Sequence, residues 1–96
     1  MTEKIKARFD HLAKKQILKE KYEAKMIFAE YDGMWKASPE LINVLNIGYK
    51  EIMYLEDLYG NPCKVPRLKF LSIVQERWQE MMNKWHDEFL TISKER

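Results

Sequence analysis

Apolar positions along this chain recur at helical spacing, without sustained strand-like alternation. The first helical run spans about residues 2–31 and contains neither Gly nor Pro. Thr2 is a suitable N-cap, and Gly33 can adopt the left-handed conformation that often follows a helix. At about 100° per residue, the apolar residues of this run fall on two nearly opposite sides. One side carries Ile17, Ala24, Ile27, Phe28 and Tyr31, and the other carries Leu18, Tyr22, Met26 and Ala29.

A second helix is predicted over about residues 39–59. The sequence "SPEL" marks its start, with Ser38 as the N-cap and Pro39 at the first helical position. Gly60 and Pro62 mark its end. Apolar residues cover nearly its whole circumference, which is typical of a buried helix. Gly48 in its middle costs about 1 kcal/mol relative to Ala, which indicates either a closely approaching neighbour helix or simple tolerance.

A third helix is predicted over about residues 66–94, with one coherent apolar stripe. Its central part, "RWQEMMNKW", is interpreted as bundle core, with an adaptable partner-binding surface as the alternative. Because both loops are short, consecutive helices are expected to be antiparallel. The sequence therefore predicts an all-α single domain of residues 1–96, a bundle of three long antiparallel helices. The stripe consists of Phe70, Leu71, Val74, Trp78, Met81, Met82, Trp85, Phe89 and Ile92.

The predicted helices differ in length, at roughly 45, 31 and 42 Å for a rise of 1.5 Å per residue. The short middle helix leaves the ends of the outer two overhanging, and both ends carry apolar side chains. The first helix also has two apolar sides. Ile17, Ile27 and Phe28, with Tyr31, are expected to close the core, while the other side faces outward. These features predict a bundle completed by dimerisation. The predicted partner or dimer interface comprises Ile5, Phe9, Leu18, Tyr22, Met26, Ala29, Phe89 and Ile92.

Composition is that of a folded protein, with 46% hydrophobic and 33% charged residues and a net charge of +2. The charge is uneven, since residues 1–25 hold eight Lys or Arg against four acids, a local balance of +4. This excess indicates either a solvated Lys-rich face or a basic arm for phosphate. Leu18 and Met26 in the same stripe, and the scarcity of Arg, weigh against nucleic acid. The possible nucleic-acid contacts are His11, Lys14, Lys15, Tyr22 and Lys25.

Candidate chemistry is sparse. The chain has two His and one Cys, without metal-ligand spacing and without a Gly-rich phosphate loop. We therefore expect neither catalytic residues nor a metal or cofactor site, although spacing leaves a Cys63–His dyad open. A lone Cys excludes an intrachain disulfide and favours a reducing compartment. Without a signal-peptide core or a membrane span, the expected location is the cytoplasm.

These observations predict a non-enzymatic small helical protein that acts by protein–protein interaction, as a regulator, inhibitor or adaptor and as a homodimer. The alternative is a nucleic-acid-binding regulator that uses the basic face of the first helix. Small size, an excess of Lys and the lack of an enzymatic motif are typical of phage or plasmid accessory proteins.

Overall fold

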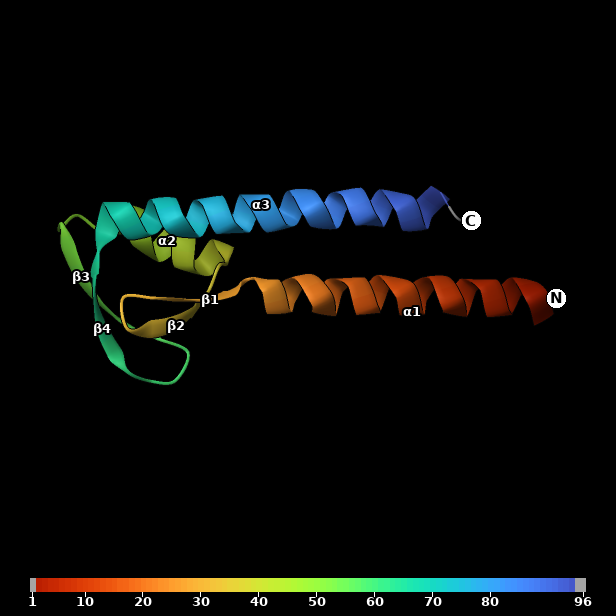
Figure 1. Cartoon of the computed structure of the whole chain (residues 1–96), viewed down its shortest axis with the longest axis horizontal. Helices are drawn as coiled ribbons and strands as arrows, with labels where there is room; N and C mark the ends of the chain where they lie inside the picture. Colours follow the sequence, from red (N-terminus) through yellow and green to blue (C-terminus); the bar gives the residue numbers. More distant parts are fainter. Residues whose placement is uncertain (1, 95–96) are drawn as a thin grey trace.

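The computed structural model describes the backbone of residues 2–94 and the side chains of residues 10–94. Three helices and two β-hairpins make up this part of the chain. Helices α1 and α3 lie side by side, and α2 and both hairpins gather at the end of the molecule away from the termini (Figure 1). The elements are α1 (Thr2–Lys25), β1 (Ile27–Glu30), β2 (Gly33–Lys36), α2 (Pro39–Ile47), β3 (Ile52–Glu56), β4 (Pro62–Pro66) and α3 (Arg67–Lys94).

The prediction of an all-α helical bundle is wrong, because two predicted helical segments contain strands. The first helix ends at Lys25 instead of near Tyr31, and the second ends at Ile47 instead of near Tyr59. The third helix is confirmed over Arg67–Lys94. The start of α2 is also confirmed, since the Ser38 hydroxyl accepts a hydrogen bond from the amide of Leu41.

The first hairpin, β1–β2, turns through two residues with positive φ, Tyr31 at 49° and Asp32 at 60°. Glu30 and Gly33 are paired on either side of them. Positive φ at both central positions is the type I′ geometry, whose twist matches that of the flanking strands. Left-handed backbone costs about 1–2 kcal/mol for a residue other than Gly. The indole of Trp35, which donates to the carbonyl of Glu30 at 2.8 Å, helps to hold the turn closed.

The second hairpin, β3–β4, replaces the last part of the predicted second helix. Gly48 leaves the helix with φ −67° and ψ 152°. The pairing then runs from Ile52 opposite Pro66 to Glu56 opposite Pro62. Residues 58–60 form the loop, with Gly60 at φ +81°. A three-residue hairpin loop needs such a left-handed residue at its end, which Gly adopts without steric cost.

Arg67, the first residue of α3, fastens the second hairpin to α2. Its side chain donates to the carbonyls of Leu45 and Lys50, at 3.2 and 2.9 Å. Leu45 lies in the last turn of α2, whose carbonyls lack helical partners and favour a positive charge. A Cβ on Gly48 would lie 2.7 Å from Arg67 Cδ and 2.8 Å from Met53 Sδ. Gly48 therefore does permit a close approach, but of a strand and an Arg side chain instead of another helix.

The core follows α3 along its length. Phe70 is fully buried, and its ring packs edge-on against Tyr31 and Trp35, with centroid distances of 5.5 and 4.9 Å. This aromatic cluster joins the first hairpin to the start of α3. All nine residues of the predicted α3 stripe are buried or packed against the core, which supports the core interpretation.

Helices α1 and α3 are antiparallel to each other. In the predicted bundle each helix is antiparallel to the next one along the chain, so the first and third helices would be parallel. Arg77 donates to the carbonyl of Lys25, while further along α3 Glu88 meets Tyr22. The inward side of α1 is also the opposite of the expected one. Ile17 is 65% exposed, and Leu18 is buried. The late turns of α3 thus lie beside α1 instead of overhanging the bundle.

Candidate functional site

The predicted interface residues occupy several different environments. Leu18, Tyr22 and Met26 are buried within the chain. Ala29 is exposed on β1, while Phe89 and Ile92 are half-buried on α3. The side chains of Ile5 and Phe9 lie outside the described residues. Since one chain does not test self-association, this set as an interface stays a prediction.

A polar cluster borders the α1–α3 contact around Tyr22. The Tyr22 hydroxyl donates to Glu88 Oε1, and Lys21 forms an ion pair with the same oxygen at 2.8 Å. The pKa of Tyr22 is raised to about 12, mainly by the hydrogen bond to Glu88 and secondly by burial. The bonds from Lys21 and Tyr22 lower the pKa of Glu88. The ring of Tyr22 also stacks on Trp85, with centroids 6.3 Å apart. These contacts join α1 to α3.

The predicted basic face lies along this same contact. The ammonium of Lys25 sits 5.4 Å from the Tyr22 ring centroid, and that of Lys15 sits 5.7 Å from the Phe89 ring. Lys14 is exposed and His11 is half-buried. Because Tyr22 is buried, it cannot stack on a base while α1 and α3 stay together. Nucleic-acid binding stays a prediction that would rest on the lysines.

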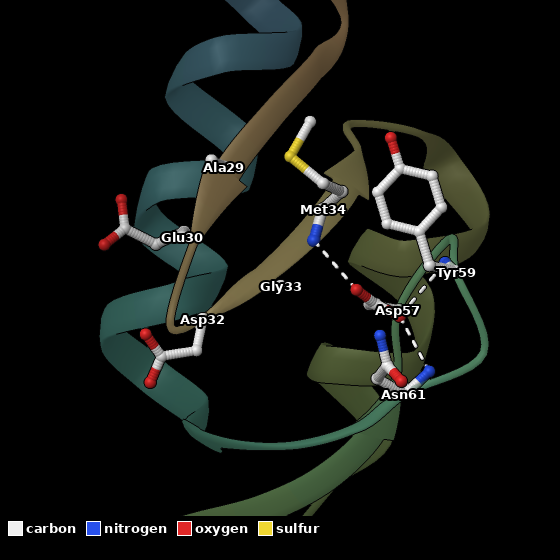
Figure 2. A pocket seen from close by; sticks show the side chains of 8 residues that line it. All are labelled: Ala29, Glu30, Asp32, Gly33, Met34, Asp57, Tyr59 and Asn61. Carbon is white, nitrogen blue, oxygen red and sulfur yellow. Dashed lines mark hydrogen bonds between the residues drawn. The ribbon is translucent and has the colours of Figure 1, made fainter.

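A surface hollow of about 410 Å³ lies between the two hairpins, and the buried carboxylate of Asp57 forms part of its wall. Figure 2 shows that carboxylate, Asp57, between the amides of Met34, Tyr59 and Asn61. These three donors lie 2.8–3.0 Å away and lower the pKa of Asp57. The lining residues are Ala29, Glu30, Asp32, Gly33, Met34, Asp57, Tyr59 and Asn61.

Asp57 thereby acts as a structural clamp. It accepts from the amide of Met34 in β2, from that of Tyr59 in the second hairpin loop and from that of Asn61 directly after the loop. The Leu58 amide donates in turn to the Met34 carbonyl at 2.8 Å. The carboxylates of Glu30 and Asp32 point away from Asp57 (Figure 2). Both oxygens of Asp57 accept from amides, so this carboxylate is held in a structural role.

Other catalytic candidates lack supporting geometry. The Cys63 thiol is buried, and burial raises its pKa, so it stays protonated and is a weak nucleophile near neutral pH. Within residues 10–94, no group of three or more His, Cys, Asp or Glu side chains could hold a metal ion. No helix in the described part of the chain is both long and apolar enough to cross a membrane.

The strongest candidate site is an exposed apolar surface at the hairpin end of the molecule. Twelve large apolar side chains are exposed among the described residues, and seven belong to residues 47–68. Tyr49, Tyr54 and Tyr59 are 86%, 71% and 74% exposed. These residues belong to the end of α2, β3, the loops around β3 and the start of α3 (Figure 1). We call the set Ile47, Tyr49, Ile52, Tyr54, Leu58, Tyr59 and Leu68 the hairpin-end surface.

Sequence reasoning missed this surface because it assigned most of these residues to a buried helix. An apolar run with large side chains at consecutive positions fits a helix apolar on all sides as well as a strand. The available signal was local turn chemistry. Gly48 lies mid-run, and the sequence from Asp57 to Gly60 fits a three-residue hairpin loop.

Comparisons of the chain with protein-family models, curated proteins and solved structures found no significant match.

Proposed function

We propose that this protein acts by binding other proteins through the hairpin-end surface, as a non-enzymatic regulator, inhibitor or adaptor. The supporting observation is the concentration of exposed aromatic and aliphatic side chains in residues 47–68. Exposed apolar side chains that gather in one region of a fold are a mark of interaction sites. Tyr is also enriched at protein interfaces, where its ring is buried and its hydroxyl keeps a polar partner.

Charge favours a protein partner over a phosphate backbone at this surface. Residues 47–68 contain three basic and three acidic side chains, so their net charge is zero. Nucleic-acid sites instead gather an excess of Lys and Arg. A neutral, aromatic surface suits a partner protein that presents apolar groups of its own. We further propose a cytoplasmic location, in keeping with a single buried, reduced thiol at Cys63.

Affinity capture with matched bait variants tests the proposed surface. The first variant carries Tyr49→Ser and Tyr59→Ser, two highly exposed substitutions expected to leave the fold intact. The control carries Ile17→Ser, which removes an apolar side chain from α1 that is 65% exposed. Loss of two aromatic anchors at more than about 1 kcal/mol each weakens binding by about 30-fold or more.

We expect the unmutated chain and the Ile17→Ser variant to capture the same partner protein, and the double Tyr variant to capture much less of it. Calorimetry with the purified partner should then give similar dissociation constants for the unmutated chain and Ile17→Ser, and a higher one for the double Tyr variant. Equal retention by all three baits would contradict the proposed surface.

The nucleic-acid alternative has its own test. If Lys14, Lys15 and Lys25 bind duplex phosphates, the logarithm of the binding constant falls with log[salt] at a slope of about −0.9 per phosphate contact. Lack of binding at low salt removes this alternative and leaves the protein-binding proposal unaffected.

A further inference from the structure

The outer edge of β3 presents unpaired main-chain groups. Two hydrogen bonds, Arg67 N to Glu51 O and Asp57 N to Asn61 O, mark the two ends of the β3–β4 ladder. In an antiparallel pair, hydrogen-bonded and non-hydrogen-bonded positions alternate. Residues 51, 53, 55 and 57 therefore bond toward β4. The amides and carbonyls of Ile52, Tyr54 and Glu56 point away from it.

The other strand edges are shorter or blocked. On β4, the outward positions are Pro62, Lys64 and Pro66, and the two prolines have no amide hydrogen to donate. Proline and Lys are common devices for protecting an edge strand. On β2, the outward amide and carbonyl of Met34 are already bonded to Asp57 and Leu58.

The outer edge of β1 has only two outward positions, at Ile27 and Ala29. β3 offers three, and its outward residues are all exposed, Tyr54 at 71%. The strand also lies at the extreme end of the molecule, away from α1 (Figure 1). An exposed, apolar edge of this kind is a template for pairing with another strand.

We propose that a second copy of this chain pairs with β3, antiparallel strand to strand, about a two-fold axis at Met53. This inference rests on the proposed function, since it names the partner that part of the hairpin-end surface takes. Pairing would join the β3–β4 hairpins of the two copies into one four-stranded sheet, β4–β3–β3–β4. Two-stranded hairpins are marginal by themselves, and added strands or packing against a helix stabilise them. Here Cys63 and Val65 already anchor β4 in the core, and pairing would add strands on the β3 side.

Charge complementarity selects the register. With the axis at Met53, Lys50 faces Glu56 of the second copy, and Ile52 faces Tyr54 of the second copy. All four side chains are exposed. A register centred on Tyr54 instead places Ile52 opposite Glu56, and leaves Lys50 opposite an apolar Leu58. Opposite charges and aromatic–aliphatic pairs directly across a ladder each stabilise it.

Two variants at one position separate main-chain pairing from side-chain contact. Tyr54→Pro removes an outward amide but no hydrogen bond to β4, so the hairpin is retained while pairing is blocked. Tyr54→Thr keeps the amide and suits a strand. Sedimentation velocity over about 1 µM to 1 mM covers the range of an ordinary dimer. We expect the Pro variant to raise the dimer dissociation constant about 100-fold or more relative to the Thr variant.

A charge exchange tests the register even if the Pro variant fails to fold. Lys50→Glu or Glu56→Lys alone places like charges opposite each other twice per dimer, and should weaken it about tenfold or more. The double variant should restore affinity. Lys50 lies in the bend just before β3 and Glu56 is the last residue of β3, so the strand separates the two side chains within one chain. Restoration by the double variant would therefore indicate a contact between chains.

A chain that stays monomeric at the highest concentration overturns the proposed pairing, as does a Pro variant that dimerises as tightly as the Thr variant. Failure of the double exchange to restore affinity overturns the Met53-centred register. A monomer that still captures a foreign protein through Tyr49 and Tyr59 refutes self-pairing and leaves the proposed function standing. A monomer that captures nothing refutes both.

Discussion

Gly48→Ala distinguishes the observed fold from the predicted one by the sign of its effect. In a helix over residues 39–59, Ala in place of an interior Gly would stabilise the protein by about 1 kcal/mol. In the structure, Gly48 has ψ 152° and lies outside the helix, so no helix propensity is gained. A Cβ there would meet Arg67 Cδ at 2.7 Å and Met53 Sδ at 2.8 Å.

The magnitude follows from what must move. Arg67 is held by two hydrogen bonds to main-chain carbonyls, so it cannot shift without weakening them. Overpacking of this kind costs about 1–3 kcal/mol. The lower entropy of the unfolded chain with Ala at 48 offsets about 0.4–1 kcal/mol. We expect a net loss of about 1–2 kcal/mol, and a fall in Tm of several degrees for a domain of this size.

Urea unfolding followed by Trp fluorescence and far-ultraviolet circular dichroism measures this loss. Met53→Ala supplies the matched background, because it removes the Sδ atom that the new Cβ would meet. Gly48→Ala should therefore cost less in the Met53→Ala background than in the unmutated chain. An increase in the free energy of unfolding on Gly48→Ala, in either background, would refute the reasoning and favour the continuous helix.

Three further predictions test other parts of the structure. Phe70→Leu and Trp35→Leu should be coupled by about 0.5–1.5 kcal/mol in a double-mutant cycle, whereas Phe70→Leu and the exposed Tyr54→Leu should add independently. Asp57→Asn should lower the free energy of unfolding at neutral pH. Folding lowers the pKa of Asp57, so the stability that the carboxylate contributes is lost as pH falls through its folded pKa, below 3.8. The variant should therefore show a weaker loss of stability at acid pH, measured by chemical denaturation across the pH range. Unfolded Tyr22 ionises near 10 and folded Tyr22 near 12, so stability should fall between pH 10 and 12, and Tyr22→Phe should remove that fall in chemical denaturation at each pH.

Local signals were sufficient for α3 and for the start of α2. The single apolar stripe from Phe70 to Ile92 recurs every three to four residues, which places it on one face of a helix. Ser38 and Pro39 specify the helix start through their own chemistry, an accepting hydroxyl and a preset φ. Such features depend little on distant residues, which is why they could be predicted from the sequence.

The hairpins depend on contacts that a local pattern does not contain. The residues of β1, Ile27–Glu30, fit the helical spacing of the residues before them, so their pattern does not mark a strand. The turn after β1 has positive φ at Tyr31 and Asp32 instead of at Gly33. What stabilises the turn is remote, since Tyr31 packs edge-on against Phe70, well along the chain. Tertiary packing of this kind overrides local propensity.

The same substitution of hairpins for helix explains why the candidate site moved. In a parallel arrangement of the outer helices, the side of α1 that carries Leu18 and Met26 has no cover, and the segment from Tyr49 to Tyr59 is core. The hairpins bring α3 back antiparallel to α1, so α3 covers Leu18 and Met26. The segment after Gly48 then becomes an end strand with its Tyr side chains in solvent. The unsatisfied apolar surface therefore lies on β3 and its loops, where main-chain groups are also unpaired, and an added strand could cover both together.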